Sequence, residues 1–276
     1  MSPGVKTSDR LTLKYFIFSM IIAIIIANVI VIFSEEPSKH SVSLWALITT
    51  AATALILGII AVCRYGIHGN HGKSYLFLTL GLISWFSADF TLLYNYYALG
   101  IKEQRLVTTT DALWFIGYGF LALHLLTVSL SLHIKIKSKI VIVVSIITAL
   151  FISYNLVNIL SYDSNIDDDF MAIIVTVLYP ILDFILIIPS SLILITLRKD
   201  YEQNIPWFLS SLSLLVNAIA DDGYVHDFVR GNSENLWFWE LFYITDFIIM
   251  TGALFWYNKF HVTNSLRNAQ LSNNHK

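Results

Sequence analysis

Seven acidic residues stand inside long apolar stretches of this sequence, where a charge is costly. They are Asp89, Asp111, Asp183, Asp221, Asp222, Glu240 and Asp246. An ionised acid near the middle of a bilayer costs about 2.5–3.5 kcal/mol on insertion scales. No lysine or arginine stands in the central part of these stretches. We therefore expect the acids to face the protein interior, where they are protonated, bound to a cation, or hydrogen-bonded to His, Tyr and Ser.

Carboxyl groups in such places support three kinds of chemistry. They can bind a small ligand, lipid or cation, they can relay ions or protons, and two of them in different environments can act as general acid and base in hydrolysis. The ligand-binding candidates are Asp89, Tyr94, Trp114, Tyr118, Asp183, Asp221, Asp222, His226, Tyr243 and Asp246. For a hydrolase, the catalytic pair would be Asp89 and Asp221.

No metal-ligand pattern stands out. Asp222 and His226 are four residues apart on one helix face, a spacing that suits either half of a metal site or, as we favour, a His–Asp hydrogen bond. His124 is expected to be an interior histidine with its hydrogen bonds satisfied. Asp111 follows three threonines and could simply cap a helix, and Glu240 could be an ordinary interfacial residue.

The composition identifies the elements that must hold these acids. Of the 276 residues, 56% are hydrophobic and only 13% are charged, against roughly 25% charged in soluble domains. This excludes an ordinary soluble enzyme and a disordered chain, and a net charge of −2 lacks the basic footprint of a nucleic-acid binder. The single cysteine, Cys63, excludes an internal disulfide framework.

We therefore expect an all-α polytopic bundle that crosses the cell membrane several times. A helix needs about 20 apolar residues to cross a bilayer, and eight stretches qualify. They form a single transmembrane domain over residues 1–264, followed by a polar tail at 265–276. The expected spans are 11–33, 42–63, 74–99, 107–132, 139–160, 169–197, 205–229 and 234–257.

The basic residues predict the orientation. With both termini in the cytoplasm, 13 of the 17 basic residues lie inside, and the outside segments hold only Lys39, Lys102, Arg105 and Arg230. Most of the acids then lie in the outer half, at the level of several tyrosines and tryptophans. This predicts an outward-facing acidic and aromatic cavity, although outer aromatic residues also form ordinary interfacial belts.

A weak internal repeat accompanies this pattern. Residues 84–94 and 216–226 both place an Ala-Asp pair at the same depth, before an aromatic-rich turn. The following spans enter in the same direction in both halves. We therefore predict a parallel four-plus-four duplication in which Asp89 and Asp221 are equivalent.

Three runs carry a family resemblance: Leu80–Asp89, Thr110–Tyr118 and Tyr179–Asp183. Their apolar residues, punctuated by Asp, Gly and aromatic residues, resemble the multi-span N-terminal regions of archaeal and bacterial sensor proteins with histidine-kinase or diguanylate-cyclase output domains. This sequence contains no such output domain, so the resemblance implies a sensor-like module that acts through a partner protein.

A weaker resemblance is to the lysoplasmalogenase-like membrane hydrolases, which are also eight-span bundles with an aspartate in each half. It implies the Asp89 and Asp221 pair named above as catalytic residues. The ranked expectation is a ligand-binding sensor-like module first, a lipid hydrolase second and an ion- or proton-coupled carrier third. The expected partners are membrane lipids and a signalling protein; no nucleic acid and no cofactor is predicted, although the acids could bind a cation.

The predicted topology can be tested with epitope tags. Tags at either terminus should resist protease added to intact cells, because both ends are expected in the cytoplasm. A tag within residues 163–169 should be cleaved. Cleavage of a C-terminal tag would require an odd number of crossings and would contradict the eight-span topology.

Overall fold

The chain folds into a bundle of long helices. The computed structural model describes residues 7–100, 107–132, 138–161, 170–230 and 236–261, and within these ranges every regular element is a helix. The elements are α1 (Thr7–Ile32), α2 (Glu36–Tyr65), α3 (Gly69–Ala98), α4 (Thr109–Ser131), α5 (Ser138–Ser161), α6 (Phe170–Leu197), η1 (Tyr201–Gln203), α7 (Ile205–Val229), α8 (Leu236–Trp256) and η3 (Tyr257–His261).

Seven of the eight long helices, all except α7, are long and apolar enough to cross a membrane. The protein is therefore a multi-pass helical membrane protein, as the sequence predicts. The α7 helix has 25 residues and packs between α6 and α8. Its lower apolar content follows from the acids, serines and asparagine that it brings into the interior.

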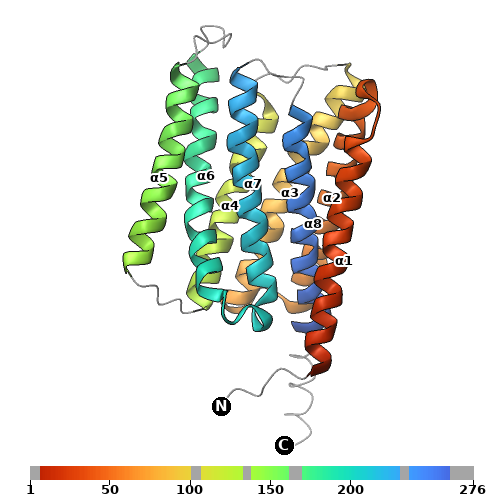
Figure 1. The fold of residues 1–276 in the computed structure, drawn as a ribbon, viewed down its shortest axis with the longest axis vertical. Helices are drawn as coiled ribbons and strands as arrows, with labels where there is room; N and C mark the ends of the chain where they lie inside the picture. The colour runs from red at the N-terminus through yellow and green to blue at the C-terminus, as the bar shows by residue number, and fades with distance from the viewer. Residues whose placement is uncertain (1–6, 101–106, 133–137, 162–169, 231–235, 262–276) are drawn as a thin grey trace, which may run out of the picture.

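Six helices form a closed ring in which each contacts the next: α2, α3, α4, α6, α7 and α8. The other two pack outside it. The α1 helix lies against α2 and α8, and α5 lies against α6 and α7, so the two helices occupy opposite edges of the bundle (Figure 1). The α1 helix begins and α8 ends at the lower end of the bundle as drawn (Figure 1). We call the opposite end, where α1 meets α2, the upper end.

The largest differences from the predicted spans are at the starts of two helices. The α2 helix begins at Glu36 instead of residue 42, with a proline in its first turn, where the missing N–H costs nothing. The α3 helix begins at Gly69 instead of residue 74. His40 and His71, which were expected in loops, therefore lie on helices. The predicted acidic loop at 163–169 and the polar tail at 265–276 are outside the described residues.

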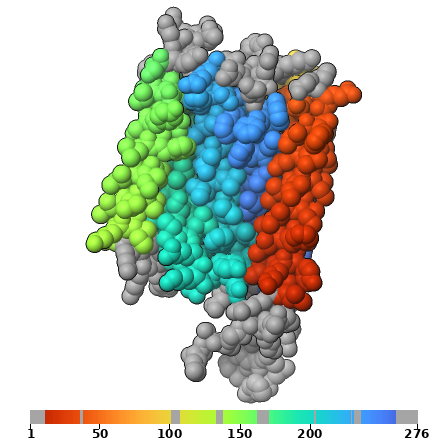
Figure 2. All heavy atoms as spheres, viewed as in Figure 1, coloured from red at the N-terminus to blue at the C-terminus, as the bar shows by residue number. Residues whose placement is uncertain are grey.

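The outermost helices carry the apolar surface of the bundle. Most side chains of α1 and α5 that are large and hydrophobic are exposed, among them Phe18 and Leu150 at 62% and 67%. These helices form the two flanks of the face drawn in Figure 2. In a bilayer such side chains contact lipid tails, so their exposure is expected of the fold.

Glycines allow close contacts between neighbouring helices of the ring. Gly117 of α4 lies directly against the indole of Trp85 on α3, and Gly223 of α7 lies against the indole of Trp239 on α8. A Cβ atom at either glycine would overlap the ring it faces. Small residues at helix contacts are typical of membrane bundles because they let backbones approach closely.

Two glycines of α4 provide a matched test of this packing. We expect Gly117→Ala to destabilise the protein by about 1–3 kcal/mol, because the added methyl group overlaps Trp85. Gly119 has no atom within 4 Å of its would-be Cβ, so Gly119→Ala should be neutral or stabilising by up to about 1 kcal/mol. Unfolding in detergent measures both, and equal effects would contradict the packing argument.

Candidate functional site

Four side chains from four ring helices form a continuous hydrogen-bonded group in the interior. We call Tyr118 (α4), Asp183 (α6), Asp221 (α7) and Tyr243 (α8) the acid–tyrosine network. The Tyr118 hydroxyl lies 2.6 Å from Asp183 Oδ1 and also hydrogen-bonds Asp221 Oδ2. The Tyr243 hydroxyl donates to Asp221 Oδ1. Because each member comes from a different helix, the network connects four of the six ring helices.

Packing around Tyr118 holds its hydroxyl in place. The ring of Trp85 meets the Tyr118 ring edge-on with centroids 5.4 Å apart, and Trp85 Nε1 donates to the backbone oxygen of Trp114 at 3.1 Å. Trp85 can reach this position because the residue before Tyr118 is Gly117. The small residue therefore contributes to the site as well as to helix packing.

The hydrogen bonds of Tyr118 place a condition on the two carboxyl groups. A tyrosine hydroxyl has one hydrogen to donate, and an ionised carboxylate can only accept. Tyr118 faces a carboxyl oxygen on each side. If Asp183 and Asp221 were both ionised, one of them would face the Tyr118 oxygen with no hydrogen between them. The arrangement is complete when one acid is protonated, or when a cation offsets the second charge.

More acid oxygens lie close to this network without a hydrogen-bond donor. Asp183 is fully buried, and its Oδ2 has no hydrogen-bond partner among the described residues. Asp222 is 2% exposed, and both of its carboxyl oxygens are without a partner in the same part of the chain. The expected hydrogen bond between Asp222 and His226 is therefore wrong. His226 Nδ1 instead lies 3.7 Å from Asp227 Oδ1.

Asp89 and Asp246 have partners of their own. Trp114 Nε1 donates to Asp89 Oδ1 at 3.2 Å. Asp246 accepts hydrogen bonds from Ser213 and, at 3.0 Å, from Asn217 Nδ2, both on α7. Asp89 and Asp221, the pair predicted for a hydrolase, thus take their hydrogen bonds from different donors. The predicted candidate Tyr94 is 53% exposed and stands outside these groups.

Asp111 caps the start of α4, as one of its two interpretations predicted. The Thr108 backbone N–H donates to Asp111 Oδ2 at 2.7 Å, which completes a capping box. The other carboxyl oxygen accepts a hydrogen bond from the Tyr179 hydroxyl of α6 at 2.7 Å. Asp111 therefore also links α4 to α6, and its carboxylate is well supplied with donors.

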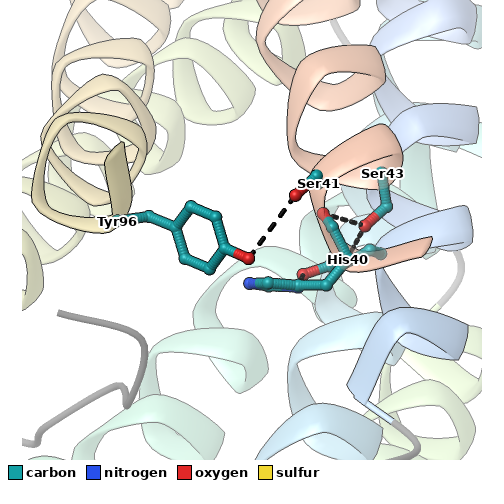
Figure 3. Close-up of polar contacts among 5 residues, drawn as sticks. His40, Ser41, Ser43 and Tyr96 are labelled. Atoms are coloured by element: carbon teal, nitrogen blue, oxygen red, sulfur yellow. Dashed lines mark hydrogen bonds and ion pairs between the residues drawn. The ribbon is translucent and has the colours of Figure 1, made fainter. Parts of the chain in front are cut away.

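The upper end holds a second polar group, which the sequence analysis did not identify (Figure 3). Ser43 donates to Glu240 Oε2, and His40 Nδ1 lies 3.2 Å from Glu240 Oε1. The His40 ring meets the edge of Tyr96 at 5.3 Å, and Ser41 Oγ lies 3.4 Å from the Tyr96 hydroxyl (Figure 3). Glu240 is 6% exposed, so it is a buried partner of α2 and not an ordinary interfacial residue.

Aromatic residues fill the opposite, lower half of the bundle. The Tyr75 and Tyr257 rings stack at 3.7 Å, and Trp207 packs 4.9 Å from Tyr75. His124 is fully buried beside them, and its Nδ1 lies 2.9 Å from Ser74 Oγ. His124 is therefore an interior histidine, as expected, but only half of its hydrogen bonds are satisfied, because its buried Nε2 has no partner among the described residues. The tight stacking makes the region a packed core.

Comparison with known proteins adds no relative. Neither a protein-family model, nor a curated protein, nor a solved structure matches the chain. Within the described residues, no three His, Cys, Asp or Glu side chains gather in a way that could hold a metal ion. The site is therefore interpreted from its own geometry.

Two interior polar residues that the sequence analysis left out of the site are Ser213 and Asn217. They precede Asp221 on α7 at intervals of four residues, so all three share one helix face. The four-residue spacing is visible in the sequence and indicates a polar stripe on one face of a membrane helix, with Asp221 as its last member.

The cap at Asp111 yields a direct test. Asp111→Asn replaces one acceptor oxygen by a donor, so it should cost about 1–2 kcal/mol from the weakened cap and the link to Tyr179. Thr109→Ala, at an exposed neighbouring position, should change stability by less than about 0.5 kcal/mol. Unfolding of both variants in detergent measures the difference. An Asp111→Asn protein as stable as the parent would contradict this assignment.

Proposed function

We propose that this protein is a sensor-like membrane module that binds a cation, either a proton or a metal cation, at the acid–tyrosine network and acts through a partner protein. One observation carries the proposal: Tyr118 offers one hydrogen to two carboxyl groups, the fully buried Asp183 and the half-buried Asp221. A site built in this way lacks one positive charge. A sensor can report whether a proton or a metal cation occupies the site and supplies that charge.

The surrounding protein does not supply the charge. Within the described residues, Asp183 accepts its hydrogen bond from Tyr118, and Asp221 accepts from Tyr118 and Tyr243. These donors are neutral phenols. Compensation must therefore come from a proton or from a bound cation, since an uncompensated charge in a low-dielectric interior is costly.

The proposal includes the predicted topology and repeat. In it, α7 also crosses the membrane, which makes eight crossings, both termini are cytoplasmic and the upper end faces outward. The ring contacts support a duplication, because α2–α3, α3–α4 and α4–α6 correspond to α6–α7, α7–α8 and α8–α2. In each half, an aromatic side chain of the later helix donates to an aspartate of the earlier one: Trp114 to Asp89, and Tyr243 to Asp221.

The alternatives find less support in the geometry. A hydrolase would need Asp89 and Asp221 to act on one substrate, but each is held by different donors. A cation carrier would use the same network, and a proline in α6 is an observation in favour of this alternative. Pro180 lies three residues before Asp183 and removes a backbone hydrogen bond from the helix, which gives this helix a weak point beside the site.

Infrared spectroscopy tests the missing charge. With the metal cations removed, the purified protein at neutral pH should show the carbonyl stretch of a protonated carboxylic acid. Asp183→Asn should weaken this signal, because the new amide donates to the network in place of the proton, and stability should stay unchanged or rise. Asp111→Asn is the control, since that carboxylate already has its donors and should leave the signal in place.

Two joint outcomes decide the proposal. A protonated-acid signal that Asp183→Asn weakens supports the proposal, and a signal that it leaves unchanged contradicts it. The parent protein could instead lack this signal and unfold at the same temperature with every metal cation tested. It would then contain two ionised carboxylates and no bound cation. That result would overturn the proposal.

A further inference from the structure

The α5 helix, at the edge of the bundle, contacts its neighbours through one narrow stripe. Its buried residues are Val144, Thr148, Ile152, Asn155 and Ile159, spaced three or four residues apart. Thr148 bonds within its own helix, to the Val144 oxygen at 2.9 Å. Asn155 is therefore the member of the stripe whose polar group is left for α6 and α7.

Two apolar clusters place Asn155 at the level of the buried acids. Ile152 packs with Ile187 of α6 and Ala218 of α7, and about two turns further along, Ile159 packs with Val225 of α7 and against Tyr179 of α6. Asn155 stands between Ile152 and Ile159. Asp183 stands between Tyr179 and Ile187 on α6, and Asp222 stands between Ala218 and Val225 on α7. All three polar residues thus occupy the same layer of one three-helix interface, enclosed by apolar contacts on both sides.

Each of these three residues has a buried atom without a hydrogen bond. Asn155 is 6% exposed and its Nδ2 has no partner, Asp183 Oδ2 has none, and neither oxygen of Asp222 has one, all within the described residues. Leaving a buried polar group unpaired costs about 1–3 kcal/mol, and more for a charged one. Three such groups at one level indicate a site for a group that the polypeptide does not provide.

We propose that Asp183, Asp222 and Asn155 bind a hard monovalent cation of the sodium type; this rests on the proposed function and names its ligand. Carboxylate and amide oxygens are the ligands that hard cations prefer. A half-turn of the Asn155 amide exchanges its Nδ2 and Oδ1, so the same side chain can turn an oxygen toward the cation. A single positive charge suits the site, because Asp222 is the one acid of the Asp183–Asp221–Asp222 group that has no donor at all.

The proposed site links cation binding to a helix outside the ring. Asn155 is on α5, which lies outside the ring and contacts only α6 and α7 to any substantial extent, whereas both acids belong to the ring. Binding draws the Asn155 amide toward α6 and α7, and so tightens α5 against the bundle. The α5 helix then reports occupancy to the surrounding membrane and to a partner that contacts it.

Thermal unfolding of the full chain in detergent tests the site, with sodium, lithium, potassium or calcium chloride compared against choline chloride at equal ionic strength. A ligand that binds only the folded state stabilises it by RT ln(1 + [L]/Kd), so the unfolding temperature rises with ligand concentration according to the affinity. We expect sodium to raise it, and Asn155→Leu to weaken the apparent sodium affinity at least tenfold. Asn158→Leu is the matched control on the same helix, because the Asn158 amide bonds to the Tyr154 backbone oxygen.

A second variant keeps the test decisive if Asn155→Leu fails to fold. Asn155→Asp adds a third carboxylate to the site and should strengthen sodium binding. Wild-type sodium dependence in Asn155→Leu or Asn155→Asp would overturn the inference, as would stabilisation by calcium but not by monovalent ions. If no metal cation acts while the protonated-carboxyl signal persists, this inference fails and the proposed function stands with a proton as its cation.

Discussion

A hydroxyl group has one hydrogen to donate, and Tyr118 places its own between two interior carboxyl groups, that of the fully buried Asp183 and that of the half-buried Asp221. In water this would matter little, because solvent molecules would supply the missing donors. In the interior of a membrane bundle the protein must supply them itself, or hold a proton or cation in their place. The site, its proposed ligand and the proposed role of α5 all follow from this shortage of one positive charge.

Most of the other buried acids have hydrogen-bond donors of their own. Asp111 receives donors from Thr108 and Tyr179, Asp246 from Ser213 and Asn217, and Glu240 from Ser43. These acids join helices to one another with their hydrogen bonds satisfied. In contrast to these acids, Asp183 and Asp222 have oxygens without a donor among the described residues, and these oxygens are free to bind a proton or a cation. A buried acid with unpaired oxygens, beside buried acids that have donors, is a physical pointer to a ligand.

The sequence predicted the helices well, because the length of an apolar run reports directly on whether a helix can cross a membrane. It also predicted that the acids face inward, since the cost of a charge in lipid follows from the residue type and its place in an apolar run. It anticipated Asp111 as a cap, as one of two interpretations, from the threonines before it. It could not predict the pairings. Tyr118 meets Asp183 and Asp221 across 65 and 103 residues of chain, and such contacts depend on how each helix is rotated. The mistaken pairing of Asp222 with His226 has the same origin: spacing on one helix identifies a face, but not the neighbour that this face meets.

A double-mutant cycle on Tyr118 and Asp183 tests the central claim most directly. Unfolding free energies in detergent would be compared for the parent protein, Tyr118→Phe, Asp183→Asn and the double variant. If the hydroxyl and the carboxyl groups share one hydrogen, the two changes are coupled, and the double variant should depart from additivity by about 0.5–3 kcal/mol. Additive effects, within about 0.5 kcal/mol, would mean that Tyr118 and Asp183 act independently, and would contradict a shared charge at this site.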